Sequence, residues 1–244
     1  MYPGSRKSSA YDRVSTMFSP DGRLYQVEYA SKIVEQGTVG VALVYGNGLI
    51  FGADKKVTSK LIKPASIEKV FKIDEHIGAI SSGLVGDARR LVQLARKEAQ
   101  ENRMYYEEKI QVEALVKQVS GIKQLFTQYA GMRPFGVSFI IGGVDESGPR
   151  VFETEPSGAL AEYHAIAIGK GKKDSMAFFE KNYREGMSFE NALSLALKGL
   201  AKGLGEKEKL DINRLDFAFV EVGGKFERVP RQRLKSVLGK KQSK

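Results

Sequence analysis

The sequence predicts a mixed α and β fold of the α+β class. Apolar runs rich in β-branched residues come first, and two helical segments, further strands, two more helices and a last pair of strands follow. Asparagine–glycine and glycine–glycine pairs separate neighbouring apolar runs, which is typical of antiparallel hairpins. Periodicity alone indicates this mixture with mainly antiparallel hairpins. Two sheet faces and two helix pairs suggest a four-layer αββα sandwich.

The first clear pattern is a tight turn followed by one amphipathic helix. Pro20 fixes its own φ angle, and Asp21-Gly22 supplies turn chemistry. From Arg23 the pattern becomes helical, and Gly37 is predicted to end the helix. One narrow stripe at helical spacing indicates the buried face of this helix: Leu24, Val27, Ser31 and Val34.

Four strands are predicted next. Residues 38–45 are apolar on both faces, which fits a strand buried on both sides. Gly46-Asn47-Gly48 separates them from residues 49–53 and predicts a hairpin. Residues 70–74 and 77–81 make a second predicted pair.

Helices and strands alternate in pairs through the rest of the chain. Helices are predicted over 87–104, 111–129 and 173–183, and another begins after Ser188, which is a good N-cap. The remaining predicted strands cover residues 137–141, 151–154, 159–168, 216–222 and 225–229. No internal repeat and no linker divides the body.

Composition excludes several classes of protein. Hydrophobic residues make up 42% and charged residues 28%, which is ordinary for a soluble globular protein. There is no cysteine, so disulfide and thiolate chemistry are excluded, and a reducing compartment is compatible with the sequence. No apolar run is long enough to span a membrane, and the first residues lack the apolar stretch of a signal peptide. A cytoplasmic location is therefore expected.

The positive charge lies mostly at the two ends. The net charge is +10, of which residues 228–244 carry +7 and residues 1–10 carry +2. The body between them is nearly neutral. A basic tail can bind polyanions, but it more often forms a solvated end that aids solubility. Nucleic acid is therefore not expected as the main partner, and polyanion binding through the tail stays open as an added role.

Three segments carry a family resemblance: Tyr11-Asp12-Arg13, the run SPDGRLYQVEYA over 19–30, and Gly37-Thr38. Together they closely resemble the N-terminal signature of proteasome α-subunits, and the resemblance continues along nearly the whole chain. It implies the αββα sandwich of N-terminal-nucleophile hydrolases. It also implies a flexible arm over 1–12 and one domain over 13–227, followed by the basic segment 228–244 with a solvated tail.

The resemblance implies a non-catalytic subunit of the 20S proteasome core. Such subunits form the outer heptameric ring, gate substrate entry into the proteolytic chamber and dock ATPase activators. The expected partners are other α-subunits, proteasome β-subunits, the C-termini of AAA+ ATPase activators and unfolded protein substrates. No cofactor is expected. Five residues match the cluster that holds the gate arms in the open position: Tyr11, Asp12, Arg13, Pro20 and Tyr29.

Four residues match the pocket between adjacent α-subunits that receives activator C-termini. Lys69 matches the lysine that binds the C-terminal carboxylate of the activator. The last three residues of such an activator are a hydrophobic residue, a tyrosine and a residue of any type. A compact ammonium group suits the binding of a terminal carboxylate. Gly37 matches a position in the wall of this pocket where a side chain would block the peptide. Glu28 and Leu84 match other residues around the pocket. Apart from the resemblance, Lys69 reads as a solvated surface lysine.

Residues 129–136 resemble the loop that, in proteasome α-subunits, lines a fixed constriction of the pore beneath the gate. Tyr129, Ala130 and Gly131 match its lining, and Ala130 replaces the first of two glycines that the family often has.

A catalytic alternative comes from the β-subunits of the same superfamily, which use a threonine freed by cleavage after a glycine. Thr38 occupies the place of that nucleophile, Asp54 that of the supporting aspartate, and Lys69 lies near the place of the lysine. In those enzymes the free α-amine of the threonine is the base. The nitrogen of Thr38 is an amide, so this alternative requires removal of residues 1–37.

Other motifs give weaker signals. Gly169-Lys170-Gly171-Lys172-Lys173 lacks the phosphate-loop pattern and is interpreted as a strand-to-helix turn whose lysines face water. His76 is expected in a turn and His164 in a strand, both as structural or surface residues. No metal site is expected, since ligand spacing is lacking.

Overall fold

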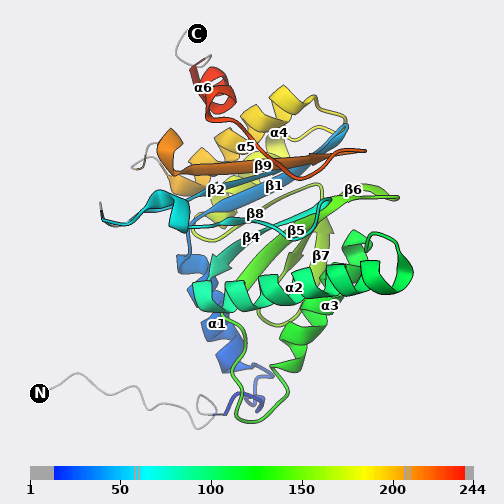
Figure 1. Ribbon diagram of the computed structural model, residues 1–244. Coiled ribbons are helices and arrows are strands. Elements are labelled where there is room, and N and C mark those ends of the chain that lie inside the picture. Colours follow the sequence, from blue (N-terminus) through cyan, green and yellow to red (C-terminus); the bar gives the residue numbers. More distant parts are fainter. Residues whose placement is uncertain (1–13, 58, 60, 206–207, 209, 240–244) are drawn as a thin grey trace, which may run out of the picture.

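Two antiparallel sheets stacked face to face form the centre of the molecule (Figure 1). The computed structural model describes residues 14–57, 59, 61–205, 208 and 210–239. Helices α2 and α3 cover the outer face of one sheet, and α4 and α5 cover the other. The predicted four-layer αββα sandwich is therefore confirmed.

The first sheet has the strand order β10-β9-β2-β1-β8, with every neighbouring pair antiparallel. Its hairpin between β1 and β2 closes at the pair Tyr45 and Gly48, as the asparagine–glycine signal predicts. The strands are β1 Gly40–Tyr45, β2 Gly48–Asp54, β8 Ala165–Ile168, β9 Leu215–Glu221 and β10 Glu227–Arg228.

The second sheet has the order β3-β4-β5-β6-β7 and is also antiparallel throughout. Since the two sheets stack, each has one face toward the other and one face toward a helix pair. The strands are β3 Val70–Lys72, β4 Ile77–Gly83, β5 Val137–Asp145, β6 Gly148–Thr154 and β7 Leu160–Tyr163.

The helices begin and end close to the predicted positions. Ser188 caps α5 as predicted, since its Oγ accepts a hydrogen bond from the Asn191 amide at 3.5 Å. The first helix begins two residues later than predicted, because the Arg23 amide is held in the preceding turn by Ser19 Oγ at 3.0 Å. The helices are α1 Tyr25–Gln36, α2 Val85–Tyr106, α3 Val112–Leu125, α4 Lys172–Asn182, α5 Phe189–Leu204 and α6 Arg231–Gly239, with short 3₁₀ turns η2 Pro64–Ser66 and η3 Ile212–Arg214. Within the described part of the chain, none of these helices has the length and apolar content needed to cross a membrane.

One predicted strand is wrong. The run 159–168 forms two strands in different sheets, β7 at the edge of the second and β8 at the edge of the first. The chain crosses between the sheets at His164, whose carbonyl accepts from the Val44 amide at 2.8 Å. The two halves of the run differ in their exposure to solvent. Residues 160–162 are exposed, whereas Ile166 and Ile168 are buried between the two sheets.

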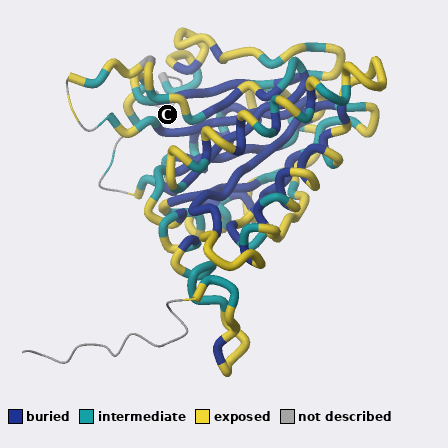
Figure 2. The backbone as a smooth tube through the Cα atoms, turned by 60° about the horizontal axis from the view of Figure 1, so that its bottom comes forward, coloured by how far each residue is buried: buried dark blue, intermediate teal, exposed yellow. Residues whose placement is uncertain are grey.

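The core consists of three apolar clusters that correspond to the three spaces between layers. The cluster between the sheets contains Phe51, Ile80, Ile140 and Val220, each with no exposed surface. Figure 2 shows these strands as buried segments at the centre, with exposed residues mainly on helices and loops. The layers are therefore held together mainly by the removal of apolar surface from water.

The basic C-terminal segment is part of the fold as far as residue 239, the last that the structure describes. Helix α6 was not predicted from the sequence. Leu234 is 1% exposed, and it packs with Val229 into the cluster beneath α5. The apolar side of α6 thus anchors a segment whose charge suggested a solvated end.

A buried lysine connects α3 to the second sheet. Lys123 has no exposed surface, and its Nζ donates to the carbonyl of Thr154 at 2.8 Å and to the hydroxyl of the same residue at 3.1 Å. Burial lowers the pKa of Lys123 to about 7, although Glu153 and Glu155 act against that shift.

We expect Lys123→Met to remove a pH dependence from the stability of the fold. The pKa of Lys123 is about 7 in the fold and 10.5 as the ordinary value of an unfolded chain, so the unfolded state binds more protons between these values. The free energy of unfolding of the wild type should therefore rise relative to the variant, by about 1.4 kcal/mol per pH unit in this window.

Chemical denaturation at several pH values measures this slope. Lys117→Met is the control, because Lys117 lies on the same helix with a side chain that is 63% exposed. Equal pH profiles for wild type and Lys123→Met would contradict the prediction.

Candidate functional site

A closed turn leads into α1. The Ser19 amide donates to the Arg23 carbonyl at 2.9 Å, and the Gly22 amide donates to the Ser19 carbonyl at 2.8 Å. Gly22 has a φ of +73°, which favours glycine. Ser19 is buried, whereas Pro20 is exposed on the outside of the turn.

Of the five predicted gate residues, the structure describes Pro20 and Tyr29. The other three, Tyr11, Asp12 and Arg13, lie outside the described residues. Tyr29 is 39% exposed on α1, and its ring stacks on that of Tyr25 with centroids 6.4 Å apart. Pro20 and Tyr29 are therefore both exposed, the first in the turn and the second on α1.

An ion pair covers the first turn of α1. Arg23 donates from Nε to the Glu28 carboxylate at 2.5 Å and also from Nη2, and its guanidinium lies 5.2 Å from the centre of the Tyr25 ring. The hydrogen bonds from Arg23 lower the pKa of Glu28. Glu28 thus already forms an ion pair with Arg23, in the first turn of α1.

The end of α1 is fixed by a close approach to β4. Gly37 has extended backbone angles, so glycine is required here by space and not by φ. A Cβ atom at Gly37 would collide with Ser82 Oγ and come 2.8 Å from the Gly83 nitrogen. Ser82 Oγ donates to the Val34 carbonyl at 3.0 Å, which ties the last turn of the helix to the strand.

Two further predicted pocket residues lie at the same strand end. Lys69 Nζ donates to the Ser81 carbonyl at 3.4 Å, and Leu84 follows β4 directly as the N-cap of α2 with 37% of its surface exposed. Burial lowers the pKa of Lys69, and the Asp54 carboxylate opposes this shift. Gly37 and Lys69 therefore both approach the end of β4, which Leu84 directly follows, whereas Glu28 lies in the first turn of α1.

Thr38 and Asp54 line one small cavity of about 50 Å³. Thr38 Oγ1 is buried and has no hydrogen-bond partner among the described residues. Asp54 is 2% exposed, and Arg214 donates to both of its oxygens, from Nε at 3.0 Å and from Nη2. The carboxylate that would support a threonine nucleophile is thus occupied by an arginine that the sequence analysis did not identify.

The predicted constriction loop is exposed and is tied to the start of α2. Tyr129 is 54% exposed, and Gly131 has a φ of +82°. Behind the loop, Arg133 donates to both oxygens of Asp87 at 2.7 and 2.8 Å, and the Gly136 amide donates to the same carboxylate at 2.8 Å. The hydrogen bond from Arg133 lowers the pKa of Asp87.

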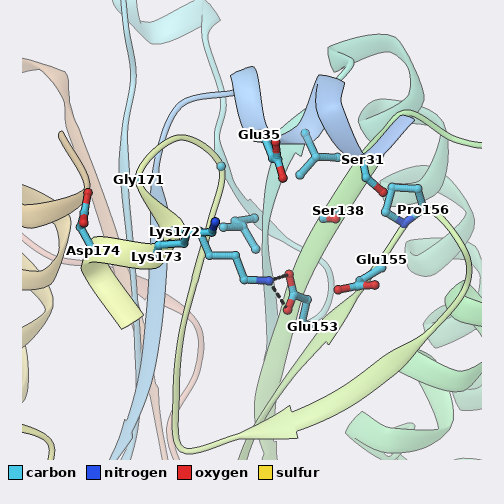
Figure 3. Close-up of a pocket in the computed structure, with 13 residues that line it drawn as sticks. Ser31, Glu35, Ser138, Glu153, Glu155, Pro156, Gly171, Lys172, Lys173 and Asp174 are labelled. Atoms are coloured by element: carbon cyan, nitrogen blue, oxygen red, sulfur yellow. Dashed lines mark hydrogen bonds and ion pairs between the residues drawn. The ribbon is translucent and has the colours of Figure 1, made fainter. Parts of the chain in front are cut away.

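A larger pocket of about 490 Å³ lies between α1, the end of β6 and the start of α4 (Figure 3). At its centre Lys172 donates to both oxygens of Glu153 at 2.6 and 2.7 Å. The Glu153 side chain is 4% exposed, and burial raises its pKa against the effect of Lys172. Figure 3 shows Glu35 and Glu155 beside this pair.

This pair corrects the interpretation of the turn at 169–173. Lys170 and Lys173 are exposed as predicted, but Lys172 pairs with the buried Glu153. The pair joins the end of β6 to the first turn of α4, and hence the second sheet to the helix that covers the first.

The described residues hold no group of three or more histidine, cysteine, aspartate or glutamate side chains suited to a metal ion. His76 is buried between β3 and β4, with Nε2 2.8 Å from the Ile110 carbonyl. This contact agrees with the predicted structural role.

Comparisons with known proteins agree with this arrangement. Residues 34–220 match the family described as proteasome subunit, and residues 11–32 match the N-terminal signature of proteasome A subunits. The proteasome α-subunit of Methanopyrus kandleri is 48% identical over 230 residues, which cover 94% of this chain and 92% of the relative. The protein of the same name from Archaeoglobus fulgidus is 49% identical over 226 residues, covering 92% of this chain and 91% of the relative.

The first match covers well over half of the chain, and the second covers the turn and most of the helix that precede the first sheet. Fold, N-terminal signature and relatives agree, and the chain belongs to the proteasome α-subunit family.

Proposed function

We propose that this chain is a non-catalytic subunit of the outer heptameric ring of the 20S core particle. In this role it gates the entry of unfolded proteins into the proteolytic chamber and docks the C-termini of AAA+ ATPase activators. Its direct neighbours are other α-subunits and proteasome β-subunits, and it takes part in protein degradation in the cytoplasm.

One observation supports docking most directly: Gly37 and Lys69, from two separate segments, both approach the end of β4, and Leu84 directly follows that strand. The exposed part of Leu84 offers an apolar surface to a hydrophobic residue near a peptide terminus. A terminal carboxylate arriving beside Lys69 would favour the charged form of an amine that burial disfavours. Glycine at position 37 lets the end of α1 lie close against the end of β4, where a side chain would collide with Ser82 Oγ.

The gating part of the proposal uses the same junction. Because α1 is fixed at Gly37, a peptide bound beside Gly37 would contact the base of the segment that carries the N-terminal arm. The exposed Pro20 turn lies at the other end of that helix. A small displacement at the base would therefore be transmitted by a rigid helix to the turn and the arm.

The non-catalytic part rests on the surroundings of Thr38. The nitrogen of Thr38 is bonded to Gly37 and cannot act as a base. Asp54 is bound by Arg214, and the Lys69 ammonium faces the Ser81 carbonyl. The alternative, a threonine hydrolase that removes residues 1–37, would also discard α1 and the ion pair between Arg23 and Glu28.

We expect Lys69→Ala to abolish the stimulation of peptide hydrolysis by an activator ATPase, because the terminal carboxylate loses its cationic partner. Hydrolysis of small peptides by the assembled core without activator should stay unchanged. Lys63→Ala is the matched control, since Lys63 is an exposed lysine of the same segment. Stimulation that persists at the wild-type level in Lys69→Ala would reject the docking site.

Deletion of residues 1–12 should raise the unstimulated hydrolysis of long peptides severalfold, because the arm would no longer obstruct the pore. Hydrolysis of very short peptides, which pass more readily, should change much less. The rates are compared in cores of the same composition with and without the deletion. Identical rates for long peptides would show that the arm is not the barrier.

We expect Thr38→Ala to leave hydrolysis by the assembled core unchanged, since Thr38 Oγ1 has no partner among the described residues and no free amine beside it. Intact subunit mass from the same sample checks whether residues 1–37 stay attached. A shortened subunit, together with loss of hydrolysis in Thr38→Ala, would identify this chain as the protease.

A further inference from the structure

Two pockets of opposite charge lie outside the docking junction. The first, the acidic pocket, is the one in Figure 3. Four carboxylates and two lysines line it, and of these only Glu153 and Lys172 form an ion pair within the described part of the chain. Three exposed carboxylates, Glu35, Glu155 and Asp174, outnumber the one remaining lysine, Lys173, so the net charge of the lining is negative.

The second, the basic pocket, has a volume of about 530 Å³. Two acidic residues, Asp216 and Glu68, line it. Lys55 lies 3.5 Å from the Asp216 carboxylate, and Arg228 lies 3.6 Å from that of Glu68. Arg228 also forms an ion pair with Asp216. Two more arginines, on α2 and α6, also line the pocket without an ion-pair partner among the described residues: Arg89 and Arg231. The net charge of the residues that line this pocket is therefore positive.

The strand order places these pockets at opposite edges of the sandwich. Lining residues of the basic pocket include Asp216 of β9, Arg228 of β10 and Glu68 shortly before β3, and these strands form one edge of the two sheets. Lining residues of the acidic pocket include Ile168 of β8, the opposite edge strand of the first sheet, and Glu153 and Ser138 of β6 and β5 in the second sheet. No residue lines both pockets.

A ring of identical subunits needs two different surfaces that complement each other. Its interfaces are heterologous, so each subunit presents two different surfaces, and the surface on one side must complement the surface on the other. Opposite charges steer such a contact, fix its orientation and disfavour wrong pairings.

We propose that the acidic pocket of one subunit meets the basic pocket of the next copy of this chain in the ring. The partner is a second copy, and the contact pairs the exposed carboxylates of Glu35 and Glu155 with the arginines Arg89 and Arg231. This inference rests on the proposed ring function and adds to it the two surfaces through which neighbours recognise each other.

Charge reversal tests the contact. One variant carries Glu35→Lys and Glu155→Lys, a second carries Arg89→Glu and Arg231→Glu, and a third carries all four changes. The four positions are exposed, so the fold should persist, and circular dichroism checks that it does. A control variant reverses two exposed carboxylates that line neither pocket, Glu146→Lys and Glu180→Lys.

Native mass spectrometry of the full chain over a series of protein concentrations measures ring formation. Each two-site reversal should raise the concentration needed for rings by about tenfold or more, because like charges then face each other. The four-site variant should recover most of that loss, since opposite charges again face each other with their positions exchanged. High salt should reduce all these differences.

Three results would count against the inference in distinguishable ways. Two-site reversals that assemble like the wild type would overturn the contact while leaving the ring in place. A four-site variant that assembles no better than the two-site variants would show that the two surfaces do not face each other. A wild-type chain that forms no ring would instead overturn the proposed ring function, and this contact with it.

Discussion

The approach of Gly37 to the end of β4 is the constraint on which the rest of the N-terminal structure depends. No side chain fits at this position, because Ser82 Oγ and the Gly83 backbone already occupy the space. The same strand end holds Lys69 through the Ser81 carbonyl and passes directly into α2 at Leu84. The position of α1 is thereby tied to the packing of both sheets, since Gly37 also accepts from the Lys170 amide at 2.8 Å.

Ion pairs that join distant segments hold the ends of the layers around this junction. Arg214 binds Asp54 across 160 positions of sequence, Arg133 binds Asp87 across 46, and Lys172 binds Glu153 across 19. Each of these carboxylates is largely buried, so the loss of the cation alone would leave an uncompensated buried charge, which is strongly destabilising. The pairs therefore fix which segments lie side by side, whereas the apolar clusters supply most of the favourable free energy.

Local signals made the fold largely predictable from the sequence, and the misses have physical causes. The Asn47-Gly48 hairpin and the Ser188 cap depend on residues close in sequence, so they were predicted. The change of sheet at His164 was missed because an apolar run does not reveal which sheet its strand joins. In α6, Leu234, Val237 and Leu238 have helical spacing, but the charge of the segment obscured this signal. Of the residues proposed for docking, Lys69 was identified by resemblance, but no local pattern could place its amine at the Ser81 carbonyl or reveal Arg214 as the partner of Asp54.

The peptide bond between Gly37 and Thr38 distinguishes the two functions that this fold could serve. If the bond were cut, Thr38 would gain a free amine beside a buried hydroxyl that has no partner in the described structure. While the bond is intact, the threonine has no base, and α1 stays attached to the sandwich at the point where Lys69 and Leu84 lie. The hydrogen bond from Ser82 to Val34 holds the last turn of α1 against β4, and Arg214 binds both oxygens of the Asp54 carboxylate. On the proposed function, the bond that prevents catalysis is therefore also the bond that carries the gate.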